Sequence, residues 1–383
     1  MPRRLRIALV GQRFMGRAHA NAWRQAGPFF DPPLSPVLHT VAGRDARALK
    51  AFARRWGWER ATTDWRVIAD DPEVDLVDVA ASNDLHAEVS LAMLEAGKHV
   101  ACEKPLARTL EEARAMREAA RGRRKPSTFV WFTYRRCPAV ALARQLVREG
   151  RLGRIAHVRA RYLQSWGGKD APFGWRFHRG TAGSGAHGDL NAHMVDLARF
   201  LTGEEVVEVH GAASRTFHRE RRVEGSRRRA RSDVDDATLF LASLSGGALA
   251  SFEATRVATG RLNANEIELN GEMGALRFAF EDMNALSFFD ATLPRRTQGW
   301  RRIVCTSAEG KHPWAEAWWP DEHPLGYEHG FVNMAADVLR ALAGRRVAIP
   351  LPDFEDGYQV QRVLEAALLA ARERAGVKLS GVR

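Results

Sequence analysis

An alternation of strand and helix patterns over the first 127 residues constrains the fold of this chain more than any other feature. Short apolar runs are followed by stretches with helical periodicity, in the order strand 5–10, helix to about 26, strand 37–42, helix 46–56, strand 75–80, helix 86–96 and strand 99–102. A repeated strand–helix–strand series forms a parallel sheet with helices on both faces. The sequence therefore predicts a doubly wound α/β domain over residues 1–127.

The turn between the first strand and the first helix carries two glycines at a characteristic spacing. Gly11 directly follows the apolar run, and Gly16 lies at the start of the helix. In a dinucleotide-binding turn these glycines permit the tight bend and close helix packing, while the helix N-terminus faces the pyrophosphate. Arg13 stands where such motifs often have a middle glycine, and its guanidinium can contact phosphate oxygens instead. We therefore expect a Rossmann domain that binds NAD or NADP at Gly11, Arg13, Phe14, Met15 and Gly16.

The end of the second strand bears on the choice between NAD and NADP. A carboxylate at this point binds the ribose 2′-hydroxyl of NAD, whereas a nearby arginine accommodates the 2′-phosphate of NADP. Gly43 occupies the position where an acid would stand, and Arg44 follows it. This pair favours NADP, although Asp45 is close enough to serve NAD.

After about residue 128 the pattern changes to long strand candidates around one strong helix. The strand patterns span 155–163, 206–216, 238–244, 249–255, 266–270 and 275–280, and the helix spans 189–201. Tight-turn signals such as Asn270-Gly271 join neighbouring strands, as in antiparallel sheets. We expect an α+β domain over 128–383, with a large, mostly antiparallel, open-faced sheet. A C-terminal helix over 353–375 is a candidate to pack back between the two domains.

Charge and composition restrict the partners that this chain can have. The formal net charge of +12 attracts polyanions without specificity. The densest basic run, at 219–231, contains no aromatic residue to stack on bases, so we expect a solvated loop there and no nucleic-acid partner.

No apolar stretch reaches the roughly 18 residues of a membrane span. Three widely spaced cysteines form no disulfide or zinc pattern, and we expect a cytoplasmic protein without a membrane partner.

Several separate motifs resemble those of the Gfo/Idh/MocA oxidoreductases, a family that includes glucose–fructose oxidoreductase and inositol dehydrogenase. They occur in family order and cover nearly the whole chain: VGQRFMGRAH at 10–19, SNDLH at 82–86, EKP at 103–105, GDLNAHMVDLAR at 188–199, VDD at 234–236 and DFEDG at 353–357. The chain departs from the family pattern in two places. Ala81-Ser82 replaces the usual Thr-Pro before Asn83, and Asn191 occupies a position that is usually small.

The resemblance implies a Rossmann domain followed by an open-faced sheet domain that commonly serves oligomerisation, so we expect a homodimer or homotetramer. It also implies that Lys104, Asp189 and His193 hold the catalytic positions, with a cis bond between Lys104 and Pro105. The matching motifs add further candidates for cofactor binding, which are Ser82, Asn83, His86, Glu103 and Lys104.

The three catalytic candidates suit the oxidation of a secondary alcohol. Removing the hydroxyl proton requires a base near neutrality, which His193 can supply, and the Lys104 ammonium can stabilise a developing alkoxide. Asp189 lies four residues before His193, so on one α-helix the two would share a face, with Asp189 orienting the histidine or the substrate. Because a further ligand at suitable spacing is missing, His187, Asp189 and His193 do not predict a metal site.

Aromatic and basic residues near these motifs are candidates for substrate contacts. Tyr134 and Arg135 follow the last expected Rossmann strand, at the domain junction, and Trp175 and Arg176 precede the glycine-rich approach to Asp189. A packing role stays equally open for these residues. The substrate-binding candidates are Tyr134, Arg135, Trp175, Arg176, Asn191 and His193.

Three functions are compatible with these features. The first is a dehydrogenase or reductase that transfers a hydride between NAD(P) and a secondary alcohol or ketone of a polyol, inositol or sugar derivative. The second is an NAD-dependent glycosidase, in which transient oxidation acidifies a neighbouring C–H and elimination cleaves a glycosidic bond. The third is a non-catalytic sensor of NAD(P) or sugar, against which the presence of Lys104, Asp189 and His193 argues. The sequence favours the first function.

Overall fold

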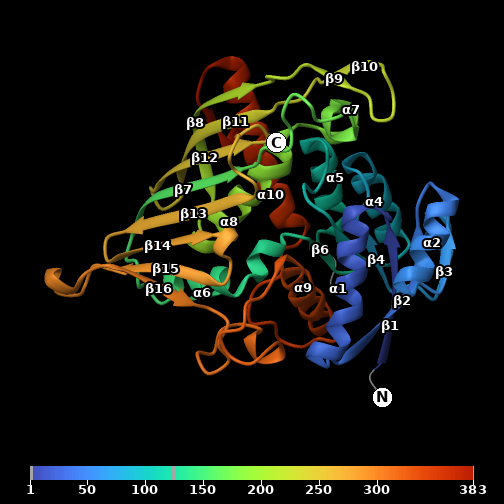
Figure 1. Cartoon of the computed structure of the whole chain (residues 1–383), viewed down its shortest axis with the longest axis horizontal. Helices are drawn as coiled ribbons and strands as arrows, with labels where there is room; N and C mark the ends of the chain where they lie inside the picture. The colour runs from blue at the N-terminus through green and yellow to red at the C-terminus, as the bar shows by residue number, and fades with distance from the viewer. Residues whose placement is uncertain (1–2, 123–125, 383) are drawn as a thin grey trace. The chain divides into compact units, whose positions relative to one another are not determined.

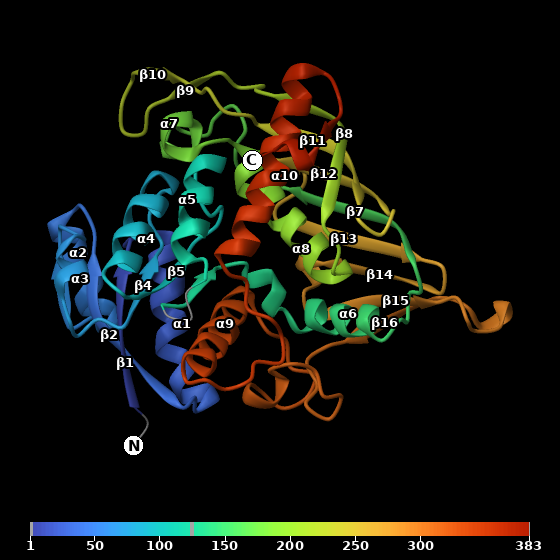
Figure 2. The ribbon, with the colours of Figure 1, turned by 180° about the vertical axis from the view of Figure 1, so that it is seen from behind.

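The computed structural model describes residues 3–122 and 126–382 of the chain. The residues group by their contacts into two units, and each unit combines two separate stretches of sequence. The first unit comprises Met1–Arg136 and Gly326–Tyr358, and the second comprises Cys137–Leu325 and Gln359–Arg383. Figures 1 and 2 show the elements of both units from opposite sides.

Within the described residues, the first unit is built on a six-stranded sheet. The strand order is β3-β2-β1-β4-β5-β6, and each neighbouring pair runs parallel. The strands are β1 Arg3–Val10, β2 Leu34–Ala42, β3 Arg60–Thr62, β4 Leu76–Val79, β5 His99–Cys102 and β6 Thr128–Val130. This order is that of the doubly wound dinucleotide-binding fold. The predicted Rossmann α/β fold is therefore confirmed.

Helices connect and cover the strands of this sheet. They are α1 Phe14–Phe30, α2 Ala46–Trp56, α3 Val67–Asp70, α4 His86–Glu95, α5 Leu110–Ala120 and α9 Tyr327–Leu342. Helix α9 comes late in the chain but packs on α1, where the Phe331 ring lies against Trp131 with centroids 6.1 Å apart. Ile7 and Leu9, on successive odd positions of β1, and Ala8 between them are all 0% exposed. Burial on both faces explains why the central strands read as continuous apolar runs.

In the described part of the chain, the second unit is built on a nine-stranded sheet. Its order is β16-β15-β14-β13-β7-β12-β11-β8-β17. Strands β12 and β7 run parallel, and the other neighbours are antiparallel. The strands are β7 Ile155–Leu163, β8 Val206–Arg215, β11 Ala237–Leu244, β12 Leu249–Thr255, β13 Ala264–Gly271, β14 Gly274–Ala279, β15 Ala285–Asp290, β16 Trp300–Val304 and β17 Val377–Lys378. The predicted, mostly antiparallel α+β fold is confirmed.

Helices cover one face of this sheet and leave the other open. The helices of this unit are α6 Pro138–Arg148, α7 Arg179–Ala182, α8 Ala192–Thr202 and the part of α10 Phe354–Glu373 that follows Tyr358, and of these α6 and α8 pack on the sheet. Helix α8 packs against β7 and β13, and α6 packs against β14 and β15 (Figures 1 and 2). Along β7, Val158, Ala160 and Tyr162 are buried on the helix side, whereas Arg159 is exposed on the other. The alternation of buried and exposed residues along β7 therefore identifies the open face of the sheet.

The basic run at 219–231 differs from the solvated loop that we expected. It forms an antiparallel ribbon of β9 Glu220–Arg222 and β10 Arg229–Arg231. Most of its arginines are exposed, but Arg221 is 0% exposed. The Arg221 guanidinium donates to Asp236 Oδ1 at 2.8 Å and lies 3.8 Å from the centre of the Phe177 ring. A buried guanidinium requires a carboxylate partner, and the run itself does not reveal which residue supplies it.

Among the helices of the described residues, none has the length and apolar character that crossing a membrane requires.

Candidate active site

The turn from β1 into α1 has no room for a side chain at either glycine. Gly11 has a φ of 126°, and a Cβ built on it would lie 2.4 Å from the Ala80 carbonyl oxygen. A Cβ on Gly16 would lie 2.2 Å from the Gly11 carbonyl oxygen. Among the residues described in the first turn of α1, none is acidic, and the N-cap residue Arg13 makes no side-chain cap. The helix N–H groups and their positive dipole end therefore suit a pyrophosphate.

Exposed side chains surround this turn. Arg13 and Phe14 are exposed and Met15 is half-buried. The Phe14 ring stacks on Tyr327 of α9, with ring centroids 6.3 Å apart and an interplanar angle of 13°. The side chains that were predicted to bind cofactor here are thus at the surface of the first unit.

Arg44 and Asp45, which follow β2, differ in their surroundings. Asp45 is the N-cap of α2, and its carboxylate Oδ1 accepts the backbone N–H of Ala48 at 3.0 Å. Arg44 is exposed. The carboxylate that could serve the ribose of NAD in sequence terms, Asp45, therefore already caps a helix.

The turn after β4 holds Ser82, Asn83 and His86 at the start of α4. Ser82 is half-buried, whereas Asn83 and His86 are buried. His86 Nδ1 lies 2.9 Å from the carbonyl oxygen of Pro105, and its Nε2 lies 3.3 Å from that of Ala81. Burial lowers the pKa of His86 despite these carbonyl contacts. A neutral imidazole has one N–H and can donate to only one of the two oxygens, and the shorter contact, with Pro105, links His86 to the loop that follows β5.

That loop, Glu103-Lys104-Pro105, follows β5 and contains a cis Lys104–Pro105 bond, as the resemblance implied. Lys104 is half-buried. Glu103 is 4% exposed, and its two carboxylate oxygens have different partners. Oε2 accepts the backbone N–H of Lys104 at 3.0 Å, and Oε1 accepts from His19 Nε2 at 3.0 Å. Glu103, predicted to bind cofactor, is therefore directed into the first unit.

In the second unit, the helix predicted over 189–201 begins with a π-helical turn, His187–Asn191, and α8 starts at Ala192. The Asp235 carboxylate accepts the backbone N–H groups of Gly185 and His187, each at 2.7 Å. A Cβ on Gly185 would lie 1.7 Å from the Asp235 carbonyl oxygen, so the chain enters this turn in close contact with 235. The expectation of one α-helix through 189 and 193 was wrong, because the wider turn changes the angle between the two side chains.

Asp189 has a partner that the sequence analysis missed. The Arg256 guanidinium, on the residue after β12, donates through Nη2 to Asp189 Oδ2 at 2.8 Å. Its Nη1 donates to the carbonyl oxygen of Arg176 at 3.2 Å, and the Trp166 ring centre lies 5.0 Å from Cζ. Arg256 is 1% exposed. The only indication of this partner in the sequence is that Arg256, a charged residue, directly follows a strand pattern.

His193 lies beside a group of polar side chains at the ends of β7 and β13. Its ring is 5.9 Å from that of Tyr162, centre to centre. The Tyr162 hydroxyl donates to Asn263 Oδ1 at 2.7 Å, and Gln164 Nε2 donates to the same oxygen at 2.8 Å. Trp166 Nε1 donates to Gln164 Oε1 at 2.7 Å. Hydroxyl and amide groups that both donate and accept are suited to a polyhydroxylated ligand.

Asn191 and His187 face the interior of the second unit. Asn191 is 0% exposed, and its Nδ2 donates to the Thr238 carbonyl oxygen at 3.2 Å and to His187 Nδ1 at 3.0 Å. His187 Nε2 donates to the Leu364 carbonyl oxygen at 2.9 Å, and burial lowers the pKa of His187. Both ring nitrogens of His187 are thus engaged within the protein.

The remaining substrate candidates lie in two places. In the first unit, Tyr134 and Arg135 are buried, and Arg135 Nη1 donates to Asp356 Oδ2 at 3.3 Å. In the second unit, Trp175 and Arg176 are half-buried, with the Arg176 guanidinium 4.3 Å from the centre of the Trp175 ring. Their contacts with substrate stay predictions.

Among the described residues, one group has side chains at metal-ligand spacing, His39, Asp71 and Glu73. Arg60 pairs with both of its carboxylates, Asp71 at 3.2 Å and Glu73 at 3.2 Å. The group is therefore part of an ion-pair network.

Comparisons with known proteins match both units. Residues 5–130 match the oxidoreductase family with an NAD-binding Rossmann fold, and residues 140–277 match the Gfo/Idh/MocA C-terminal domain. Levoglucosan dehydrogenase from Pseudarthrobacter phenanthrenivorans is 38% identical over 97% of this chain and 97% of its own length. The chain belongs to the Gfo/Idh/MocA oxidoreductase family.

Solved structures of this family are similar over the whole chain. An oxidoreductase domain protein from Kribbella flavida is 49% identical, covers 99% of this chain and 100% of its own, and has a TM-score of 0.93. Levoglucosan dehydrogenase in complex with NADH and levoglucosan is 38% identical, covers 98% of this chain and 99% of its own, and has a TM-score of 0.92. The predicted function, nicotinamide-dependent oxidoreduction of a polyol or sugar CH–OH group, is confirmed at this level by the family and its named dehydrogenases.

Proposed function

We propose that this protein oxidises a secondary hydroxyl of a cyclic sugar, with an anhydrosugar such as levoglucosan as the first candidate, or reduces the corresponding ketone. The observation that carries this proposal is the 38% identity to levoglucosan dehydrogenase over nearly the full length of both chains. The hydrogen-bonded group of Tyr162, Gln164 and Asn263 beside His193 supports it, because sugar hydroxyls require neighbours that donate and accept.

In the proposed mechanism, His193 removes the proton of the reacting hydroxyl, as a base whose ordinary pKa lies near neutrality. The Lys104 ammonium donates a hydrogen bond to the same oxygen and stabilises its developing negative charge. Asp189, held by Arg256, orients the imidazole or a second hydroxyl. A bound nicotinamide would supply the hydride acceptor for oxidation and the hydride donor for reduction.

We also propose that Arg44 allows the site to take NADP, and that it favours NADP over NAD. The support is that Arg44 is exposed at the end of β2, whereas the neighbouring Asp45 caps α2. An arginine at this point is suited to a 2′-phosphate. The solved structure of levoglucosan dehydrogenase with levoglucosan contains NADH, so both coenzymes must be compared.

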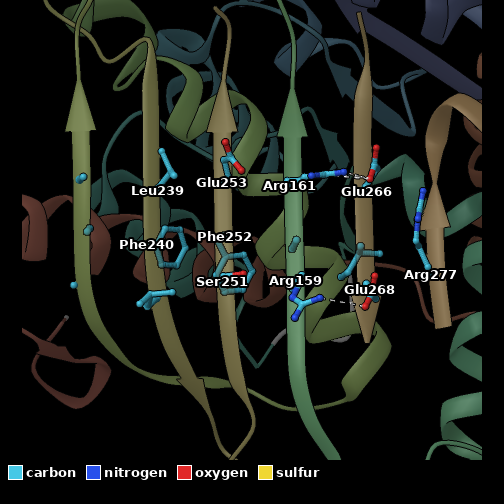
Figure 3. A pocket seen from close by; sticks show the side chains of 16 residues that line it. Arg159, Arg161, Leu239, Phe240, Ser251, Phe252, Glu253, Glu266, Glu268 and Arg277 are labelled. Carbon is cyan, nitrogen blue, oxygen red and sulfur yellow. Dashed lines mark hydrogen bonds and ion pairs between the residues drawn. The ribbon is translucent and has the colours of Figure 1, made fainter. Parts of the chain in front are cut away.

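The open face of the nine-stranded sheet supports the proposal of a homodimer or homotetramer. Leu239 and Leu241 of β11 and Leu249 of β12 are 45%, 58% and 57% exposed. Beside them, Arg161 pairs with Glu266 at 2.6 Å and Arg159 pairs with Glu268 at 3.5 Å (Figure 3). Exposed apolar side chains bordered by charged ones are typical of a protein–protein interface. We propose that the same face of a second copy covers them, as in two-fold symmetric dimers.

The expected cytoplasmic location belongs to the same proposal. All three cysteines, Cys102, Cys137 and Cys305, are buried free thiols, which is the state expected in a reducing compartment. Fractionation of the source cells tests this location.

The test of the proposed function is a screen of NAD and NADP reduction against levoglucosan, inositols and common sugars. We expect coenzyme reduction in proportion to ketone formed, with levoglucosan among the substrates. Cleavage of a glycoside without net coenzyme reduction would instead indicate the oxidation–elimination mechanism. Coenzyme or sugar binding without any turnover would indicate a sensor.

A further inference from the structure

A charged imidazole is enclosed between two carboxylates beneath the Lys104 loop. His19 of α1 is 0% exposed. Its Nδ1 donates to the Asp78 carboxylate, at 2.9 Å from Oδ1 and 3.0 Å from Oδ2, and its Nε2 donates to Glu103 Oε1 at 3.0 Å. Asp78 is fixed in turn by the indole N–H groups of Trp23 and Trp131, at 2.7 and 2.9 Å. Both imidazole N–H groups and both Asp78 oxygens are thus engaged.

The surroundings of His19 keep it protonated. Burial alone lowers the pKa of an imidazole, but the charge and hydrogen bonds of Asp78, followed by those of Glu103, raise the pKa of His19 to about 9. Asp78 lies on β4 and Glu103 follows β5, while α9 contributes the uncharged Phe331 ring, 5.6 Å from the imidazole centre to centre. At neutral pH both ring nitrogens therefore donate, and one of them determines where the Glu103 carboxylate lies.

Glu103 passes this constraint on to the next residue. Its Oε2 accepts the backbone N–H of Lys104 at 3.0 Å, and its own N–H donates to the Val79 carbonyl oxygen at 2.9 Å. Glu103 is 4% exposed, so water competes little with the hydrogen bonds that its carboxylate accepts. The backbone from which the Lys104 side chain starts is therefore attached to His19 through a single carboxylate.

We propose that His19 is a positioning residue for Lys104, acting through the carboxylate of Glu103. This inference rests on the proposed catalytic role of Lys104. If the carboxylate loses its donor, it can rotate away from the Lys104 N–H, and the lysine loses its fixed starting point. A displacement of about 1 Å at a catalytic group can lower a rate by roughly 100-fold.

The first unit contains a matched control. His39 of β2 is 2% exposed and also lies between two carboxylates, with Nδ1 3.0 Å from Glu59 Oε2 and Nε2 3.1 Å from Asp71 Oδ2. Neither of these carboxylates belongs to the Lys104 loop. His39→Gln therefore removes a similar buried imidazole from the same unit and leaves the Glu103 carboxylate with its donor.

The experiment compares wild type, His19→Gln, His39→Gln and Lys104→Ala by thermal unfolding, NADH affinity, kcat and KM with levoglucosan. We expect both histidine variants to unfold at lower temperature. We expect His19→Gln alone to lose about 10- to 100-fold in kcat, with an NADH Kd within about threefold of wild type. Equal kcat in His19→Gln and His39→Gln would overturn the inference. So would a loss in His19→Gln that appears as weaker NADH binding at unchanged kcat.

The Lys104→Ala variant separates this inference from the proposed function. Wild-type turnover in Lys104→Ala would remove the lysine from the mechanism, whereas lost turnover in Lys104→Ala with full turnover in His19→Gln would refute only the role of His19. If His19→Gln does not fold, Glu103→Gln and Glu103→Ala provide the test. The glutamine oxygen can still accept the Lys104 N–H and the alanine cannot, so we expect a lower kcat in Glu103→Ala at similar NADH affinity. Equal kcat in these two variants would overturn the inference.

Discussion

The Arg256 guanidinium donates a hydrogen bond to the Asp189 carboxylate at 2.8 Å, and Arg256 is only 1% exposed. A second nitrogen of the same group holds the Arg176 carbonyl oxygen at 3.2 Å. A buried cation thus fixes one oxygen of the carboxylate that we assign to orientation in the active site. Because an unpaired charge is costly at such a position, the two residues depend on each other.

Replacing Arg256 should damage both stability and turnover. In Arg256→Leu the Asp189 carboxylate loses the Arg256 guanidinium. Because the Asp189 side chain is 24% exposed, we expect the unfolding free energy to fall by less than the roughly 3–5 kcal/mol of a fully buried pair. We expect kcat to fall by about 10- to 100-fold, as for a misplaced catalytic group. Arg256→Lys retains the charge and should lose less of both. Denaturant unfolding and steady-state kinetics measure the two effects. Full kcat in a destabilised Arg256→Leu would show that Arg256 supports only the fold.

Removing either proposed catalytic side chain should stop the chemistry without releasing the coenzyme. We expect His193→Ala to lower kcat by about 10²–10⁴-fold, as for loss of a general base, and Lys104→Ala by about 10²–10³-fold, as for loss of one oxyanion donor. NADH affinity, measured by fluorescence titration, should change little in His193→Ala. A variant with wild-type turnover would exclude its residue from the mechanism.

Arg44→Asp should move the coenzyme preference from NADP toward NAD. The aspartate would repel the 2′-phosphate and accept from the 2′-hydroxyl, so the ratio of kcat/KM for NADP to that for NAD should fall at least about tenfold, which corresponds to about 1.4 kcal/mol. The exposed Arg47 of α2 provides the control, as Arg47→Asp makes the same charge change farther from the strand end. An unchanged ratio in Arg44→Asp would show that another residue selects the coenzyme.

The stability of the first unit should fall as the pH rises above neutrality. The pKa of His19 is raised to about 9 in the folded protein, above the ordinary value of about 6.5, so the folded state holds the proton more tightly. Protonated His19 contributes on the order of 3 kcal/mol to the unfolding free energy. This contribution is fully present below pH 6.5 and is lost as the pH rises through about 9. Thermal unfolding between pH 6 and 10 should therefore decline less steeply in His19→Gln than in wild type. Parallel curves would contradict this.

A charged residue on the open sheet face should separate the subunits. Leu241 is 58% exposed, and Leu241→Arg would place an unpaired charge in the proposed interface, which opposes association. Leu262→Arg, at a leucine that is 78% exposed outside the strands, is the control. Sedimentation should show a smaller species for Leu241→Arg alone. Identical sedimentation of wild type and both variants would place the subunit contact elsewhere.

Local patterns in the sequence predict much of the fold. The strand Ile155–Leu163 and the helix Ala46–Trp56 have the predicted bounds, because each has a clear period and is bounded by glycine or a capping acid. The pattern failed at 187–191, where a π-helical turn replaces the start of the predicted helix. At the entry to this turn the Asp235 carboxylate accepts the Gly185 and His187 N–H groups. Asp235 lies in a distant part of the sequence, and no periodicity connects it to this turn.

The residues of the candidate site also divide into those that the sequence identifies and those whose partners it does not reveal. Gly11 and Gly16 could be identified because a tight turn restricts the residues that fit it. Arg256 and His19 could not be assigned their partners, since Asp189 and Glu103 are reached only through tertiary packing. Arg221 shows the same limit, because one buried residue within a run of exposed arginines has no distinguishing composition.

The passage of the chain between its units at three points, 136/137, 325/326 and 358/359, limits how the protein can be divided. A truncated protein that stops at Arg136 would omit α9 and leave the aromatic surface around Trp131 open to water, which invites aggregation. Exchanging the nucleotide-binding half with that of a relative would require matched grafts at all three junctions. The protein therefore behaves in engineering as two interleaved pieces, and any library of chimeras should be cut at those junctions.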